Sequence, residues 1–293
     1  MPHIDTLVED IQKLLTEGKR DAKPTSSTNS DNTDRVERFG KSLSSLVSSR
    51  LYGVPRVPGL TLSQLGVPDR KLWYQTNKPE LSEPLTASTR LKFLYGDILE
   101  ELLLFLAEEA GHDVQGRQDT LAVHGVEGHR DAVVDGRLID VKSASSYSFQ
   151  KFKDGRLSED DPFGYRTQLD SYLAGSADDP LVTEKELASF LVVDKTLGHL
   201  CLDTHSKQDV NYEEVVKKKR EILALPEPPE EKCYQPVPEG KSGNEKLSVG
   251  CSYCPFKKDC WPGLRTFVYS SGPVYLTKVV REPKVYEVTD ASD

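Results

Sequence analysis

Apolar positions along the chain recur at two spacings, one typical of amphipathic helices and one typical of short strands. In residues 4–15 and 91–110 they recur every three or four positions, and the second segment ends at Gly111, which suits the residue after a helix. Residues 122–126 and 189–202 read as strands. The other predicted helices are residues 35–51, 165–173 and 212–225. This order predicts an α/β fold with a central mixed sheet flanked by helices.

A two-residue turn at Asp135 and Gly136 predicts a β-hairpin. These residue types tolerate the positive φ that both central positions of a type I′ turn require. Counting outward from the turn places Asp131 opposite Asp140, and strand alternation places Lys142 on the face of Asp140. Like charges in facing positions destabilise a pair, and a divalent cation would compensate. The alternative is that both carboxylates point into water.

The helix predicted at residues 91–110 carries two adjacent glutamates with different expected surroundings. Projected at the helical period, Glu101 lies on a polar stripe with Asp97 and Glu108, whereas Glu100 lies at the margin of the apolar face. We therefore expect Glu100 to point toward a site and Glu101 to be solvated. The apolar stripe expected to be buried consists of Ile98, Leu99, Leu102, Leu103, Leu106 and Ala110.

Composition and charge narrow the class of protein. The chain has 293 residues, 37% of them hydrophobic and 29% charged, which is ordinary for a soluble globular protein. A net charge of −9 argues against a protein coated in basic surface, so any DNA footprint would be a local groove. No apolar run is long enough to cross a bilayer and no signal-peptide pattern is present. We expect a cytoplasmic protein with no membrane partner.

Residues 65–74 interleave basic and aromatic side chains. Arg70 and Lys71 stand close to Trp73 and Tyr74. Such a pattern can contact phosphates and stack on bases. The alternative is that the two rings pack an N-terminal layer while the cations face water.

The cysteines are concentrated near the C-terminus, since four of the five follow residue 230. In a cytosolic chain such a cluster more often binds metal than forms disulfides. Cys251, Cys254 and Cys260 follow a C-x2-C-x5-C spacing. Cys201 alternates with leucines on a predicted strand, and we expect it to be a lone strand cysteine.

Several of these residues together resemble the motifs of the PD-(D/E)XK nuclease superfamily. Glu100 on a helix, then Asp131, then Asp140 and Lys142 in IDVK, follow its order. The Gly96 to Glu100 spacing is similar to that of the lambda-exonuclease-like, or YqaJ-type, branch, and Gln168 with Tyr172 resembles the Q-x-x-x-Y helix of RecB-like nucleases. The resemblance covers roughly residues 91–202. It departs at Arg130, where many members carry a proline.

The resemblance implies a restriction-endonuclease-like core and a role for each matched residue. Glu100, Asp131, Asp140 and the carbonyl of Val141 would bind Mg²⁺ or Mn²⁺. Lys142 would orient the attacking water and stabilise negative charge, Gln168 would position the nucleophile or a phosphate, and Tyr172 would brace its helix or contact DNA. The further residues expected at the substrate are Tyr165, Ser143, Arg70 and Lys71.

The cysteine spacing is similar to that of the iron–sulfur clamp of RecB-like nucleases. In those proteins a fourth cysteine precedes the nuclease core. No cysteine here precedes Cys201, so Cys233 is the best fourth ligand beside Cys251, Cys254 and Cys260, and the site would be local to the C-terminal segment. A [4Fe-4S] cluster, a Zn²⁺ ion and free thiols all stay open.

These interpretations divide the chain into five segments. The N-terminal amphipathic helix would either dock a replication or recombination protein or cover the fold. The expected segments are an N-terminal helix at 1–17, a flexible linker at 18–34, a helical and loop layer at 35–90, a nuclease core at 91–225 and a four-cysteine metal-binding segment at 226–293.

The expected function is a divalent-metal-dependent DNA nuclease, most like an exonuclease of phage or bacterial replication, recombination or repair, acting in a bacterial or phage-infected cytoplasm. A restriction-like or structure-specific endonuclease is the alternative within the same class. A catalytically silent DNA-binding scaffold with a structural metal site, or a zinc-stabilised interaction module, is the alternative outside it.

Overall fold

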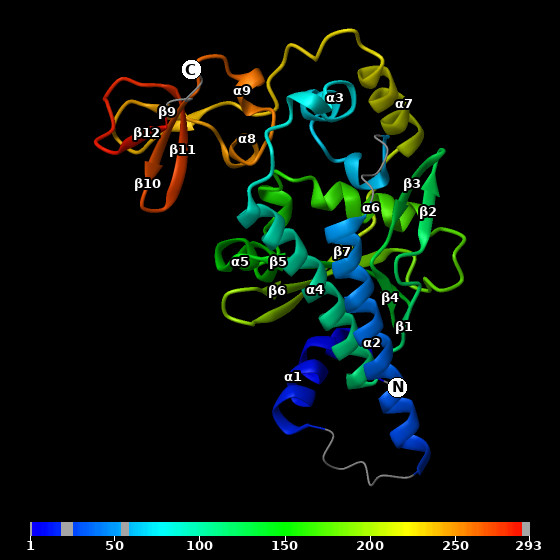
Figure 1. Ribbon diagram of the computed structural model, residues 1–293. Helices are drawn as coiled ribbons and strands as arrows, with labels where there is room; N and C mark the ends of the chain where they lie inside the picture. Colours follow the sequence, from blue (N-terminus) through cyan, green and yellow to red (C-terminus); the bar gives the residue numbers. More distant parts are fainter. Residues whose placement is uncertain (1, 19–25, 54–58, 289–293) are drawn as a thin grey trace.

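A five-stranded mixed sheet forms the centre of the computed structural model, which describes residues 2–18, 26–53 and 59–288. The central neighbours β5 and β6 run parallel, while the other three pairs are antiparallel. This architecture confirms the predicted α/β class, with helices on both faces of the sheet (Figure 1). In spatial order the strands are β1 (Val114–Gln115), β4 (Ala132–Val134), β5 (Arg137–Ala144), β6 (Leu187–Asp194) and β7 (Leu200–Ser206).

One face of the sheet is covered by the N-terminal segment together with α4 (Ala87–Ala110). A 3₁₀ turn at Ile4–Thr6 leads into α1 (Leu7–Glu17), as the periodicity of residues 4–15 predicted. Ile4, Leu7 and Ile11 are fully buried against α4 and the sheet. The apolar face of α1 therefore covers the fold and does not dock a partner.

A second long helix, α2 (Ser26–Tyr52), packs on the outer side of α4, where the rings of Phe39 and Phe105 stack at 4.5 Å. The predicted linker at 18–34 is therefore wrong from Ser26 onward, because those residues form the first turns of α2. Its positions 19–25 lie outside the described residues.

Helix α4 packs between the sheet and α2, and its buried face is wider than the predicted stripe. Four of the six predicted positions pack in the core, namely Leu99, Leu103, Leu106 and Ala110. The side chains buried most deeply are Leu103, Leu104 and Ala107, which face the sheet. Phe105 faces α2 instead. Glu100 precedes Leu104 and Ala107 by four and seven positions, so it stands on the sheet-facing side of the helix.

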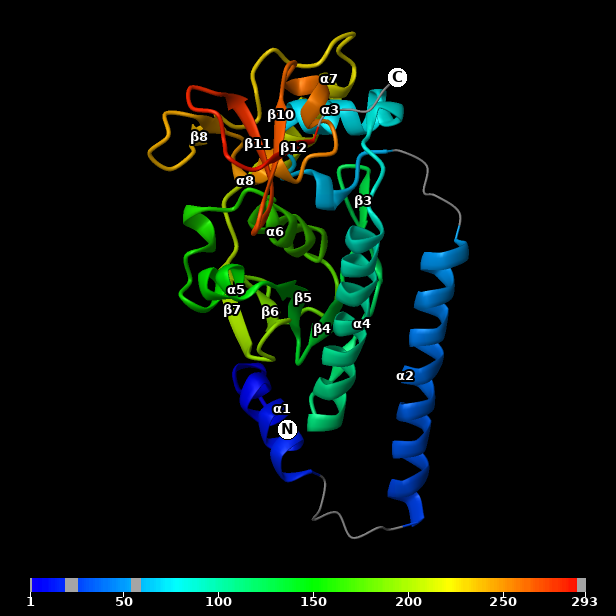
Figure 2. The ribbon, with the colours of Figure 1, turned by 60° about the vertical axis from the view of Figure 1, so that its left-hand side comes forward.

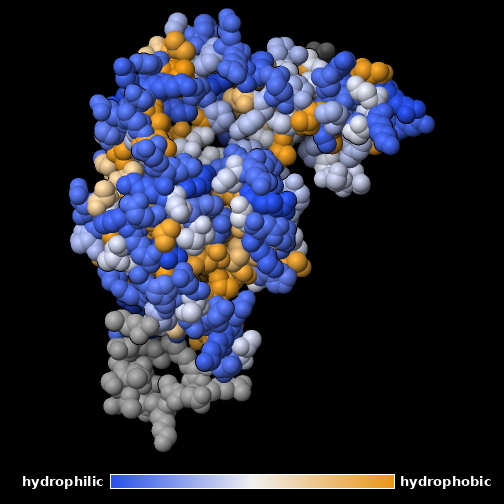
Figure 3. Space-filling view, turned by 180° about the vertical axis from the view of Figure 1, so that it is seen from behind, coloured by the Kyte–Doolittle hydropathy of each residue, from blue (hydrophilic) through white to orange (hydrophobic). Residues whose placement is uncertain are grey.

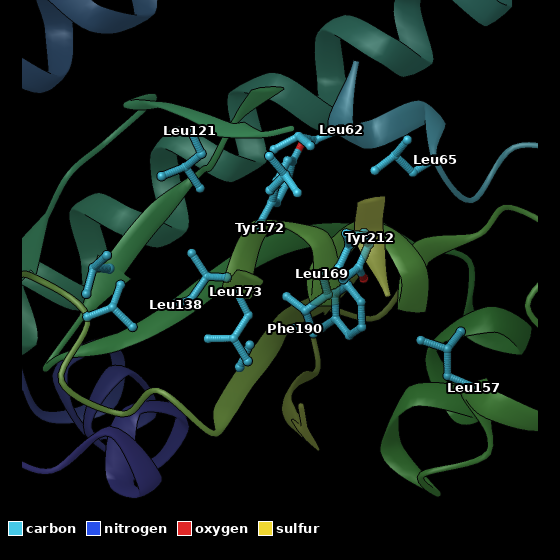
Figure 4. Close-up of a cluster of buried hydrophobic side chains, with 14 of the residues drawn as sticks. Leu62, Leu65, Leu121, Leu138, Leu157, Leu169, Tyr172, Leu173, Phe190 and Tyr212 are labelled. Atoms are coloured by element: carbon cyan, nitrogen blue, oxygen red, sulfur yellow. The ribbon is translucent and has the colours of Figure 1, made fainter. Parts of the chain in front are cut away.

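The other face of the sheet is covered by α6 (Tyr165–Gly175), α7 (Tyr212–Leu223) and α5 (Ser146–Lys153), the last within a segment for which only a loop was predicted. Leu169 and Leu173 of α6 lie near Leu138 and Phe190 of the sheet, whereas Tyr172 extends toward Leu62 (Figure 4). A short 3₁₀ turn, Leu157–Glu159, lies between α5 and α6.

A separate two-stranded hairpin stands where a single strand at 122–126 was predicted. It consists of β2 (Thr120–Val123) and β3 (Val126–His129). His124 and Gly125 both have positive φ, at 47° and 73°, so the chain reverses in the middle of the predicted strand.

The C-terminal residues form a module that was not predicted beyond its cysteines. Its five-stranded antiparallel sheet stands out from the body as a lobe (Figure 2, Figure 3). Trp73 and Tyr74 of α3 (Asp69–Asn77) pack against Phe256 of this module. The elements of the module are β8 (Val237–Pro238), β9 (Glu245–Lys246), α8 (Val249–Ser252), α9 (Lys257–Cys260), β10 (Arg265–Tyr269), β11 (Gly272–Lys278) and β12 (Tyr286–Val288). Two further 3₁₀ turns, Leu62–Gln64 and Pro79–Leu81, flank α3.

Within the described residues, no helix combines the length and the apolar character that crossing a bilayer needs.

Candidate active site

The β4–β5 hairpin has the turn and register that the sequence predicted. Asp135 and Gly136 have φ of 48° and 84°, as a type I′ turn requires. Ala132 pairs with Ile139, so the next positions outward are Asp131 and Asp140. Asp131 lies just before β4 and its Oδ2 accepts a hydrogen bond from the amide of Val141 at 2.7 Å. The two aspartates are thus held together at the open end of the hairpin.

Lys142 and the helix α6 complete the surroundings of Asp140. The Lys142 ammonium forms an ion pair with Asp140 Oδ2 and lies 5.0 Å from the ring centre of Tyr165. Gln168 Nε2 donates to Asp140 Oδ1 at 3.0 Å and to the hydroxyl of Tyr172 at 3.4 Å. The structure therefore brings the predicted residues of α6 and β5 into one network, in which Asp140 and Tyr172 are buried.

Glu100 reaches the same network from α4, and Glu101 does not. The charges of Asp140 and Lys142 both act on Glu100, whereas Glu101 forms an ion pair with Arg117 at 3.5 Å. Glu101 is thus paired with a cation rather than simply solvated. The helical phase placed Glu100 on the side of Asp140, whereas the predicted solvation of Glu101 is wrong.

The pKa values of these groups reflect burial together with an excess of negative charge. Burial and then the charge of Asp140 raise the pKa of Glu100 to about 7. Burial, followed by Asp140 and Glu100, raises the pKa of Asp131 well above its ordinary range. Burial lowers the pKa of Lys142, but Asp140 and Asp131 outweigh it, so the pKa is raised. Three carboxyl groups thus surround one lysine that stays protonated.

The donor set suits a hard divalent cation, because it offers several carboxylate oxygens whose mutual repulsion is not fully neutralised. In the described part of the chain, however, no three His, Cys, Asp or Glu side chains stand ready as a metal cage. The Asp140 oxygens contact Gln168 and Lys142, and one Asp131 oxygen accepts from Val141. The residue types therefore suit a cation, but in this structure their oxygen atoms contact neighbouring protein groups.

Gln118 is a residue of this site that the sequence analysis missed. Its side chain donates to Glu100 Oε1 at 2.8 Å, and its amide donates to the carbonyl of Asp131 at 3.2 Å. It has a positive φ of 56° in the loop between β1 and β2. A glutamine in an irregular loop carries no periodic signal, so nothing in the sequence pattern pointed to it.

Arg130 stands where the resembled motif has a proline, and its side chain has a structural role. Its side chain is buried and forms ion pairs with Asp119, at 2.8 Å, and with Asp179. Its Nε also donates to the carbonyl of Gly116 at 3.1 Å. These contacts fix the backbone directly before Asp131, which is what a proline would otherwise restrict.

The glycine of the G-x-x-x-E spacing allows α4 to approach β5 closely. A Cβ atom at Gly96 would lie 3.4 Å from Ser143 Oγ, so a larger side chain would press on the strand. The side chain of Ser143 thus lies beside α4, on the face of the sheet opposite to that of its neighbour Lys142.

Arg70 and Lys71 lie at the cysteines, not among the carboxylate contacts described above. Arg70 Nε donates to Cys260 Sγ at 3.4 Å, and Lys71 lines the same pocket. Trp73 and Tyr74 are buried beside them. Trp73 and Tyr74 therefore pack inside the protein, as the alternative to base stacking predicted.

The four C-terminal cysteines converge on one small cavity of about 20 Å³, although none of the triplets among them forms a ready metal cage in the described residues. Burial, and then the neighbouring thiols, raise the pKa of Cys254 to about 11. All five cysteines of the chain are free thiols. Cys201 lies apart from the others on β7. The cysteines around the cavity are Cys233, Cys251, Cys254 and Cys260.

Comparison with known proteins gives a likeness in fold. No family model matches the chain, and no curated protein does. Among solved structures it is similar to the alkaline exonuclease LHK-Exo of Laribacter hongkongensis, with 18% identity, a TM-score of 0.40, and coverage of 58% of this chain and 88% of that one. It is also similar to SSO0001, with 15% identity, a TM-score of 0.43, and coverage of 77% and 95%. A phage related exonuclease from Haemophilus somnus 129PT matches with 13% identity, a TM-score of 0.35, and coverage of 58% and 92%.

The order of elements around the central sheet is regular. Helix α4 precedes β1, β4 and β5, which pair antiparallel, then α5 and α6 follow, and β6 joins β5 in parallel. At the identities and TM-scores of these neighbours the likeness is distant, so the assignment of the site comes from its side-chain geometry.

Proposed function

We propose that the protein is a divalent-metal-dependent nuclease that hydrolyses phosphodiester bonds of DNA. The observation that carries this proposal is the convergence of Glu100, Asp131 and Asp140, from different elements, on the half-buried Lys142. Clusters of this kind with raised carboxyl pKa values occur preferentially at functional sites. The excess of carboxyl groups supports Mg²⁺ or Mn²⁺ as the missing counter-charge, held by these three side chains and the carbonyl of Val141.

A bound divalent cation would activate water and neutralise charge on the phosphate. Lys142 keeps its proton at neutral pH because its pKa is raised. It therefore acts as a hydrogen-bond donor and a positive charge toward the attacking water and the developing phosphorane, not as a general base. Gln168 holds Asp140 through its amide and is a positioning residue. Tyr172 is buried and braces α6 against the sheet.

The proposed form is an exonuclease of phage or bacterial DNA replication, recombination or repair. It rests on the resemblance of the Gly96 to Glu100 and Gln168 to Tyr172 spacings to those branches. The test described next distinguishes an exonuclease from an endonuclease and from a catalytically silent DNA-binding scaffold.

The test compares linear DNA with covalently closed circular DNA in the presence of Mg²⁺. We expect wild type to degrade the linear form only, and Lys142→Ala to lose about 100-fold or more of that activity. Lys153→Ala, which removes an exposed lysine on α5, is the matched control and should keep full activity. Cutting of circles would support an endonuclease, and DNA binding without cutting of either form would leave only the scaffold.

We further propose that Cys233, Cys251, Cys254 and Cys260 hold a structural metal. Four converging thiols support either Zn²⁺ or a [4Fe-4S] cluster. The four thiols line the same cavity, and either group would be held by them. Visible absorbance of anaerobically purified protein tests this, because a zinc protein is colourless and an iron–sulfur protein is brown.

A replication or recombination protein that docks on the N-terminal helix would have to contact the exposed side of that helix. Ile4, Leu7 and Ile11 are buried in the core and offer nothing to a partner. The exposed side chains of α1, such as Leu15 and Glu17, are what such a partner would meet.

A further inference from the structure

A row of aromatic rings leads from the proposed catalytic lysine to the surface of the cysteine module. The Lys142 ammonium lies 5.0 Å from the ring centre of Tyr165. The ring centres of Tyr165 and Phe163 are 5.4 Å apart, and those of Phe163 and Tyr253 are 6.2 Å apart. Exposure increases along the row, since Tyr165 is partly buried, Phe163 is 36% exposed and Tyr253 is 74% exposed.

The outer rings are held by rigid parts of the chain. Tyr253 directly precedes Cys254, which lines the cysteine cavity, and its amide donates to the carbonyl of Val249 at 3.3 Å. The hydroxyl of Tyr234 donates to the carbonyl of Pro162 at 2.8 Å, which ties the module to the residue before Phe163. A large side chain that is exposed yet fixed in place is typical of a binding platform.

Gly164, between the two inner rings, also restrains their loop. It has a positive φ of 74°, and a Cβ atom there would lie 2.4 Å from the carbonyl oxygen of Gly66. Only glycine fits this close approach of two backbones. The loop that presents Phe163 and Tyr165 is therefore anchored to the segment before α3.

The charge around the row favours recognition of bases over recognition of phosphates. The nearby acidic side chains are already partnered: Asp160 forms an ion pair with Lys151, and Asp161 accepts from the amides of Phe163 and Arg166. An acidic loop attracts no phosphate, whereas the face of an aromatic ring stacks on any base without a charge contact.

We propose that Phe163 and Tyr253 form a stacking platform for unpaired bases of a DNA strand whose phosphate reaches Lys142. The ligand class is thus single-stranded nucleic acid at the mouth of the site. The inference rests on the proposed nuclease function only for the position of the scissile phosphate. It adds to that function that the DNA entering the site is single-stranded.

The test measures binding of fluorescein-labelled oligothymidylate to the full chain without added Mg²⁺ or Mn²⁺, so that no DNA is cut. The second probe is an abasic strand with the same number of phosphates. We expect Tyr253→Ala to weaken binding of oligothymidylate at least about fivefold and to leave the abasic strand unchanged. Tyr253→Phe, which keeps the ring, should bind as wild type does. Tyr286→Ala removes a tyrosine that is 70% exposed on β12 and is the matched control.

Equal binding of oligothymidylate by wild type and Tyr253→Ala would overturn the platform. An equal loss for both probes would also overturn it, because that result marks a phosphate contact. Cleavage of linear DNA is measured separately with Mg²⁺. If wild type cuts DNA but Tyr253→Ala binds oligothymidylate as wild type does, the nuclease proposal stands and the platform proposal is wrong. If Tyr253→Ala weakens binding but wild type cuts no DNA, the platform proposal stands and the nuclease proposal is wrong.

Discussion

At the scale of single residues, the site is a balance between three carboxyl groups and one ammonium group. Lys142 neutralises Asp140 directly, and Glu100 and Asp131 respond to the remaining charge by holding protons more tightly. With a pKa of about 7, Glu100 is about half protonated at neutral pH when no cation is bound. A divalent cation would have to displace that proton.

This pKa predicts a pH-dependent stability in the absence of divalent cations. The pKa of Glu100 is about 7 in the folded protein and about 4.5 in the unfolded chain, so between these values the folded state binds the proton more tightly. The free energy of unfolding should fall by about 3 kcal/mol as the pH rises from 4.5 through 7. Glu100→Gln should flatten that slope, measured by urea denaturation with EDTA.

Glu101→Gln serves as the control, since Glu101 pairs with Arg117 and its charge affects the pKa of Glu100 less than burial and the charge of Asp140 do. It should keep most of the slope of wild type. If the two variants gave the same curve, the charge balance around Lys142 would be misassigned.

The helical period was enough to separate Glu100 from Glu101, and the hairpin turn was enough to place Asp131 beside Asp140. Both follow from regular backbone geometry that repeats along the chain. Gln118 and Arg130 could not be predicted in the same way. Their contacts depend on loops whose course is set by tertiary packing, and no local pattern encodes it.

At the scale of elements, α1 is part of the core and not an appendage. We predict that Ile11→Ala, which empties a fully buried position between α1 and α4, lowers the free energy of unfolding by about 2–4 kcal/mol. Leu15→Ala, at a position of α1 that is 63% exposed, should change it by less than about 0.5 kcal/mol. Urea denaturation measures both. Equal effects would mean that α1 is not docked as described.

The elements that the sequence pattern missed are those with weak local signals. The segment 26–34 is rich in Ser, Asn, Thr and Asp, which favour turns and caps over helix interiors, yet it continues into α2. Helix α5 has eight residues with only two buried rings, Phe149 and Phe152. Strands β8 and β9 have two residues each, too few for an alternation to be recognised.

At the scale of the whole molecule, the cysteine module joins segments that are far apart in the sequence. Arg70 and Tyr74 of α3 contact Cys260 and Phe256, which lie almost two hundred residues later. The predicted layer at 35–90 and the predicted segment at 226–293 are therefore packed together. A sequence without internal repeats gives no signal of such a long-range contact.

This arrangement predicts which cysteines matter for a metal. Cys254→Ser should lose the bound metal, and its melting temperature should fall, because a ligand is removed from a site that ties distant segments together. Cys201→Ser, on β7, should keep the metal content of wild type. Elemental analysis per chain measures both. Metal retained by Cys254→Ser, or lost by Cys201→Ser, would contradict the proposed ligand set.

The most direct test of the central proposal is the rate of Mg²⁺-dependent degradation of linear DNA by two adjacent glutamine variants. We predict that Glu100→Gln loses about 100-fold or more, because it removes a cation ligand that faces Asp140, and that the rate requires higher Mg²⁺ concentrations. Glu101→Gln should stay within about threefold of wild type, because its side chain faces Arg117. Full activity in Glu100→Gln, or an equal loss in both variants, would contradict a cation site built on Glu100, Asp131 and Asp140.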